Sequence, residues 1–202
     1  MDTEKKSNET QINQFNKIQL WNNMANQIAY FAFQHGNQTI FDIMDLKCGG
    51  IPDGAYDQII DLQAQDEFIS LYTQIAENRF AWAVNVLLEM SEKAKPVIKE
   101  FMFRTGKEMN IEAINSAAEA FEIYKSFVLD GMPDKETKNV LETSENLVRW
   151  EKVFDTHKNA WEKAEGELNF YYELQTDFIS GLFSNTNYAF KTDGNVFEIT
   201  KN

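Results

Sequence analysis

The chain has 202 residues, with 32 acidic and 19 basic side chains and a net charge of −13. A charge of this sign repels nucleic-acid phosphates and anionic lipid headgroups, which disfavours ordinary direct nucleic-acid binding and docking on a membrane surface, and we expect neither. There is no apolar run of about 18 residues to span a bilayer, and a single cysteine excludes an intrachain disulfide, so we expect a soluble, cytoplasmic protein.

The N-terminal half reads as helices separated by short loops. Residues 1–10 are polar, and we expect a frayed N-terminus. Apolar residues recur every three or four positions over 11–35 and again over 65–94, which predicts two long amphipathic helices. A short helix is predicted at 38–47, and the Pro and Gly of 51–54 predict a loop.

The middle of the chain predicts two further helices. Pro96 suits the first turn of a short helix that ends at Thr105, with Gly106 as its stop. Asn110 is a suitable N-cap for the next helix, which Gly131 ends.

The C-terminal part shows a heptad-like repeat. From Val140 onward, large side chains recur at alternating steps of three and four, which predicts one helix over 134–183. At a rise of about 1.5 Å per residue this helix would be roughly 75 Å long. It must then break near Gly166, overhang the bundle or pair with another copy. The residues of this predicted seam, which we expect in a core or an interface, are Leu147, Trp150, Phe154, His157, Trp161, Leu168, Tyr171, Phe178 and Leu182.

These patterns together predict an all-α protein. Residues 11–183 would form a multi-helix bundle domain with the very long C-terminal helix as its last element. The tail, 184–202, contains Asp193-Gly194 between two short β-prone runs, which indicates a β-hairpin.

Few residues offer chemistry. His157 could serve a metal or cofactor, but the Glu-x-x-His pairs of di-metal bundles do not occur in the sequence. Cys48 has Asp42 and Asp45 nearby, and negative charge opposes a reactive thiolate. We therefore predict no enzyme activity, no catalytic residues, no cofactor and no metal.

Carboxylates gather on the flanks of the predicted helix. Rows of acids on a rigid helix can imitate phosphate spacing, although a solvated helix face is the simpler explanation. The residues of this predicted acidic face are Glu142, Glu145, Glu151, Asp155, Glu162 and Glu165.

Three functions remain open. The first is a non-enzymatic interaction or assembly protein that acts through amphipathic helix faces, self-associates and binds a protein partner, which the negative charge suggests is basic. The second is an acidic inhibitor that mimics nucleic acid and blocks a basic nucleic-acid-binding protein. The third is a helical bundle that holds a cofactor or a metal through His157.

Overall fold

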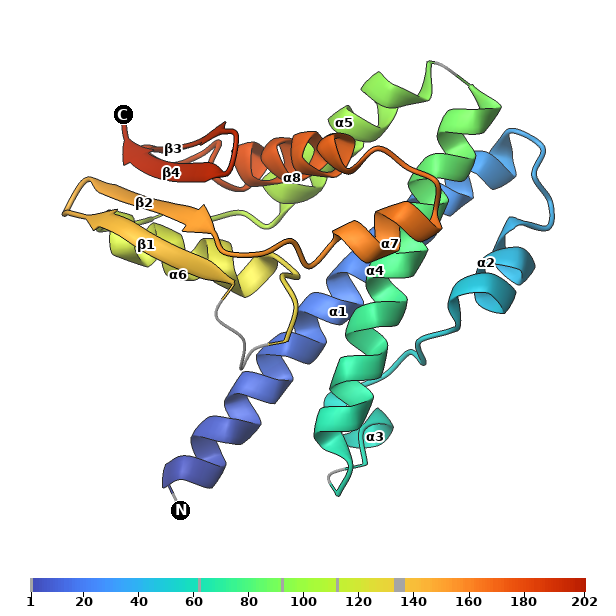
Figure 1. The fold of residues 1–202 in the computed structure, drawn as a ribbon, viewed down its shortest axis with the longest axis horizontal. Helices are drawn as coiled ribbons and strands as arrows, with labels where there is room; N and C mark the ends of the chain where they lie inside the picture. Colours follow the sequence, from blue (N-terminus) through green and yellow to red (C-terminus); the bar gives the residue numbers. More distant parts are fainter. Residues whose placement is uncertain (1, 62, 92, 112, 133–136) are drawn as a thin grey trace. The chain divides into compact units, whose positions relative to one another are not determined.

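The computed structural model describes residues 2–61, 63–91, 93–111, 113–132 and 137–202. Within these ranges the chain forms eight helices and four strands, and the strands make one antiparallel sheet (Figure 1). The protein is therefore mixed α and β, and the all-α prediction is wrong. Among the described residues, no helix has both the length and the apolar character that crossing a membrane requires.

The chain divides into two compact units, each built from three separate stretches. Unit 1 comprises Met1–Glu92, Leu129–Lys135 and His157–Gly166. Unit 2 comprises Lys93–Val128, Glu136–Thr156 and Glu167–Asn202.

Unit 1 is built on two long helices that lie side by side (Figure 1). Its helices are α1 (Asp2–Gln34), α2 (Ile40–Cys48), α3 (Tyr56–Ile59), α4 (Gln65–Met90) and α7 (Lys158–Lys163). The α1–α4 pair is parallel, because Gln14 donates to Thr73 and Trp21 packs edge-on against Phe80 at 5.0 Å, in the same order along both helices. The ring of Trp161 in α7 lies 6.5 Å from that of Phe80, which extends this core.

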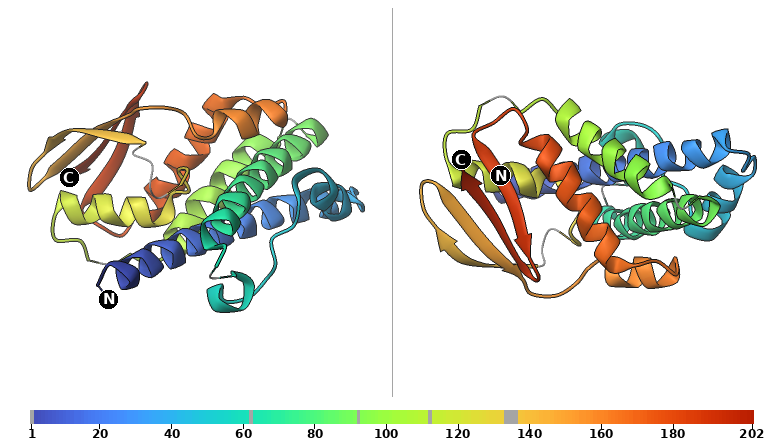
Figure 2. Two further views of the ribbon diagram at one scale, coloured as in Figure 1. Left: turned by 60° about the horizontal axis from the view of Figure 1, so that its bottom comes forward. Right: turned by 90° about the horizontal axis from the view of Figure 1, so that it is seen from above.

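Unit 2 combines a helix pair with the sheet. Its elements are α5 (Ala94–Glu108), α6 (Ala117–Phe127), β1 (Lys138–Thr143), β2 (Leu147–Lys152), α8 (Leu168–Leu182), β3 (Tyr188–Asp193) and β4 (Val196–Lys201). Figure 2 shows α5 and α8 side by side. The two backbones touch at glycines: a Cβ atom on Gly106 would lie 2.0 Å from the carbonyl oxygen of Phe178.

The sheet has the strand order β1-β2-β4-β3 and buries one face. Trp150 of β2 is 1% exposed, and its ring lies 4.6 Å from Phe121 and 4.9 Å from Tyr124, both in α6. Arg149, the neighbour of Trp150, points to the opposite face and pairs with Glu198 at 2.7 Å. This alternation of inward apolar and outward charged residues is the two-residue period of a half-buried strand.

The very long C-terminal helix does not exist. Its predicted start at Asp134 lies outside the described residues, and the stretch that follows forms β1, β2, α7 and α8 in succession. The chain turns between the strands where Ser144 donates to the carbonyl of Leu147. Near Gly166 there is indeed a break, but the left-handed residue is Glu165, with φ of 57°.

Several boundaries also differ from the prediction. Helix α1 already begins at Asp2, and Gly106 lies inside α5 instead of ending it. Asn110 is left-handed at φ 51°, and α6 begins later, after Ser116 accepts a capping hydrogen bond from the backbone N–H of Glu119. The C-terminal hairpin is confirmed, with Gly194 left-handed in its turn at φ 57°.

Candidate functional site

The predicted seam residues lie on several elements of both units. Leu147 and Trp150 belong to β2, His157 and Trp161 to the region of α7, and the last four to α8. A single continuous seam is therefore wrong, because no one rod carries these side chains. The buried members are Trp150, His157, Trp161, Tyr171, Phe178 and Leu182, the half-buried ones are Leu147 and Leu168, and Phe154 is 45% exposed.

The predicted acidic face is dispersed in the same way. Glu142 lies on β1 and Glu151 on β2, whereas Glu162 lies on α7 and Glu145 and Glu165 lie in turns. Several of these carboxylates are engaged locally: Glu142 lies 3.6 Å from Arg149, Glu151 accepts from Asn139, and Asp155 lies 2.7 Å from Lys152. The row of carboxylates along one rigid helix is therefore wrong.

His157 lies buried between two carboxylate side chains of unit 1. Its side chain is 3% exposed, with Nδ1 3.3 Å from Oε1 of Glu77 and Nε2 3.7 Å from Oδ1 of Asp130. The imidazole therefore lies between Glu77 of α4 and the chain at Asp130. Among the described residues there is no group of three or more His, Cys, Asp or Glu side chains arranged to hold a metal ion.

Cys48 is the last residue of α2 and lies within reach of the charge of the buried Arg79. Arg79 donates to Asp45, to the carbonyl of Gly49 at 2.7 Å and to Oδ1 of Asn26 at 2.9 Å. Burial raises the pKa of the Cys48 thiol, and Asp45 raises it further, although Arg79 and Lys47 act in the opposite direction. A raised pKa disfavours the thiolate, which is the nucleophilic form of cysteine.

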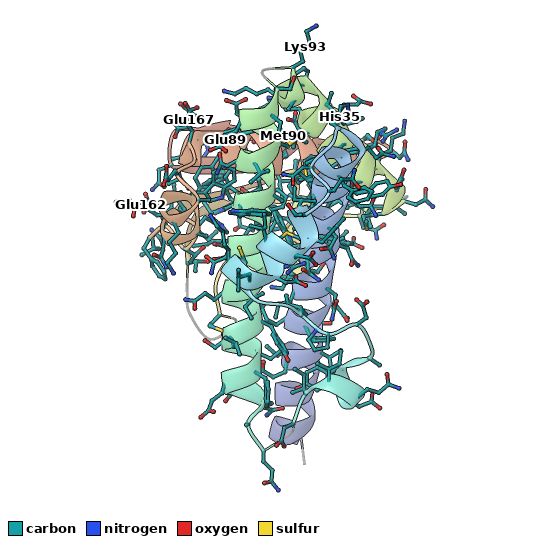
Figure 3. All side chains as sticks on the ribbon, turned by 90° about the vertical axis from the view of Figure 1, so that its right-hand side faces the viewer. His35, Glu89, Met90, Lys93, Glu162 and Glu167 are labelled. Atoms are coloured by element: carbon teal, nitrogen blue, oxygen red, sulfur yellow. The ribbon has the colours of Figure 1, made fainter. Side chains whose placement is uncertain are left out.

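The feature that stands out is the outer side of α2. Leu46 is 86% exposed and Ile43 is 36% exposed, although Ile40 and Met44 of the same helix are fully buried. Leu46 and Ile43 are three residues apart, so they share one side of the helix. Figure 3 looks toward the side of unit 1 on which α2 crosses in front of α1 and α4.

A row of rings lies beside α2. Tyr30, 45% exposed, stacks on Phe33 at 6.1 Å, and Phe33 lies 6.1 Å from Phe41 of α2. Around the helix, Asp42 and Asp45 fall between Phe41 and Leu46, because successive side chains turn by about 100°. We define the α2 surface as Tyr30, Phe41, Asp42, Ile43, Asp45 and Leu46.

The surroundings of the α2 surface are strongly acidic. Residues 40–67 contain seven acidic side chains, all exposed, and one basic residue, Lys47. The exposed acids are Asp42, Asp45, Asp53, Asp57, Asp61, Asp66 and Glu67. Part of this segment is tied down, since Gln19 donates to the carbonyl of Pro52 and Gln11 to Asp66.

Sequence reasoning missed the α2 surface. Six of the nine residues of α2 are apolar, so they surround the helix, and such a helix is expected to be covered on all sides. The signal present in the sequence was a short helix with apolar residues on all sides and two carboxylates, Asp42 and Asp45, among them.

Comparison of the chain with protein-family models, curated proteins and solved structures gives no match.

Proposed function

We propose that this protein is a non-enzymatic interaction protein that binds another protein through the α2 surface. The observation that carries the proposal is Leu46, a large apolar side chain 86% exposed on a regular helix. Single exposed leucines are common, but this one shares its helix side with the exposed Ile43. Clustered apolar side chains within a polar rim are typical of interaction sites.

The helix is held in place from beneath, which supports a binding role. Arg79 ties the last turn of α2 to α1 and α4 through Asp45, the Gly49 carbonyl and Asn26. A surface that is already ordered loses less conformational entropy when a partner binds.

Site-specific photo-crosslinking in native lysate tests the proposal. A photoreactive amino acid at position 46 should capture a discrete set of proteins that the same group at position 97 does not. Val97 is a matched control, because it is 49% exposed on helix α5 of unit 2. Excess unlabelled wild-type protein should suppress the capture, whereas excess Leu46→Glu protein should not. Equal capture at both positions would contradict the proposal.

Self-association stays a separate prediction, and it would have to use a surface other than the acidic α2 surface. Light scattering over a range of concentrations tests it, and a monomer at high concentration would contradict it.

Competition with nucleic acid for a basic protein is the second candidate. The acidic segment 40–67, with seven exposed carboxylates and one base, supports this candidate, whereas the dispersed carboxylates of the predicted acidic face do not. If this candidate holds, neutralising Asp53, Asp57 and Asp61 should abolish binding to the captured partner, whereas Leu46→Glu should have little effect. The opposite result would contradict it.

A further inference from the structure

We infer that the partner presents a basic amphipathic helix to the α2 surface. The inference rests on the proposed function and adds the chemistry of the partner. Its lysines or arginines would lie over Asp42 and Asp45, and its apolar residues over Leu46 and Ile43 on one side and Phe41 on the other.

The charge of the surface selects a basic partner. Asp45 keeps 61% of its side chain exposed while it pairs with Arg79, and Asp42 is exposed one turn before Leu46. Apart from Lys47, the segment 40–67 has no basic residue that could neutralise its seven acids. A second copy of the chain would bring the same carboxylates together, and like charges across an interface are unfavourable.

The backbone of the surface selects a helical partner. An extended peptide binds most readily to an open sheet edge, where main-chain hydrogen bonds supply affinity. Helix α2 satisfies its backbone internally and provides no such edge. What it presents is a ridge of side chains, Ile43 and Leu46, which can pack into the groove of another helix.

Designed peptides of about 20 residues, long enough for several helical turns, test the inference on the full-length protein by fluorescence anisotropy. The first has leucines at helical spacing and lysines elsewhere, the second replaces every lysine with glutamate, and the third scrambles the first sequence to destroy the period. Only the first peptide should bind appreciably. Leu46→Glu should weaken its binding at least about tenfold, the scale expected for an interface anchor.

Two control variants separate apolar docking from simple charge attraction. Leu141→Glu changes a side chain that is 49% exposed on β1 of unit 2, and it should leave the affinity unchanged. Asp42→Asn should weaken binding and flatten its salt dependence, whereas Asp193→Asn on β3, also exposed, should not.

Three results would overturn the inference. They are equal binding of the scrambled peptide, binding that Leu46→Glu does not affect, and no binding of the first peptide. If instead the glutamate peptide binds in a Leu46-dependent way, the basic partner is refuted while the α2 surface remains a docking site. The photo-crosslinking at position 46 tests the proposed function separately, so the two failures can be told apart.

Discussion

Gly106→Ala is expected to destabilise unit 2, although the substitution improves the intrinsic helix propensity. Gly106 lies inside α5, where replacing glycine by alanine should gain about 1 kcal/mol from propensity alone. The added Cβ, however, would lie 2.0 Å from the Phe178 carbonyl oxygen and 2.8 Å from the Leu182 backbone nitrogen. The obstacle is backbone, so rotating a side chain cannot remove it.

The magnitude follows from the contact distance. A carbon–oxygen contact normally lies at about 3.3–3.6 Å, so α5 and α8 must separate locally by more than about 1 Å. Overpacking of this kind costs about 1–3 kcal/mol, sometimes more, and outweighs the propensity gain. We expect a net loss of up to about 2 kcal/mol for Gly106→Ala, and a similar loss for Gly181→Ala, whose Cβ would lie 2.0 Å from the Phe103 carbonyl oxygen.

Urea unfolding followed by circular dichroism measures this loss, and hydrogen exchange of the α5 and α8 amides locates it. The double variant should lose less than the sum of the single variants, because one separation of the helices relieves both contacts. Gly50→Ala is the control, since no atom lies within 4 Å of the added carbon. An increase in the free energy of unfolding for Gly106→Ala would refute the close crossing.

Three further predictions concern charge. Arg79→Met should lower the free energy of unfolding by about 1–3 kcal/mol in urea titrations, because the part-buried oxygens of Asn26 and Gly49 lose their donor while Asp45 turns to water; an unchanged midpoint would contradict this. Lys99→Met should cost about 0.5–1 kcal/mol at pH 7. Burial raises the pKa of Asp177, whereas the charge of Lys99 lowers it. The cost of Lys99→Met should therefore shrink as falling pH protonates the Asp177 carboxyl. A cost that grows on acidification would argue against this prediction. Cys48 should react with iodoacetamide more slowly than glutathione at pH 8.5, because burial raises its pKa, and equal rates would disprove the raised value.

The long N-terminal helices could be predicted because their pattern is unambiguous. In α1, Phe15, Ile18, Trp21 and Ile28 return to the same side at every turn, and all four are buried. A stripe sustained over so many turns has no extended alternative, since a strand would place such residues on both faces.

The repeat after Val140 led to a wrong helix prediction, because apolar residues at steps of three and four also fit a strand over a short stretch. Val148 and Trp150 are both 1% exposed, and the residues beside them, Arg149 and Glu151, are charged. This period of two was present in the sequence, but it covers only six residues of β2. The turn at Ser144 and the helix break at Glu165 then interrupt what a heptad count treats as continuous.

The candidate site could not be predicted because exposure is a tertiary property. Periodicity shows that α2 is apolar, but not which of its sides the rest of unit 1 covers. Arg79 decides this: by holding Asp45 and the Gly49 carbonyl, it fixes the rotation of α2 so that Ile40 and Met44 are buried and Leu46 is exposed.

The same arrangement explains why an exposed leucine can persist on a regular helix. If α2 were free to roll, Leu46 would gain by turning inward, since burying a leucine side chain is worth about 1.5–3 kcal/mol. Gly49 turns the chain at φ 87° directly after α2 and leaves room for Ile75, because a Cβ at this position would lie 3.1 Å from Cδ1 of Ile75. The exposure of Leu46 therefore follows from the fold of unit 1. A partner that covers this side chain would gain the free energy of burying it, and this gain would stabilise the complex.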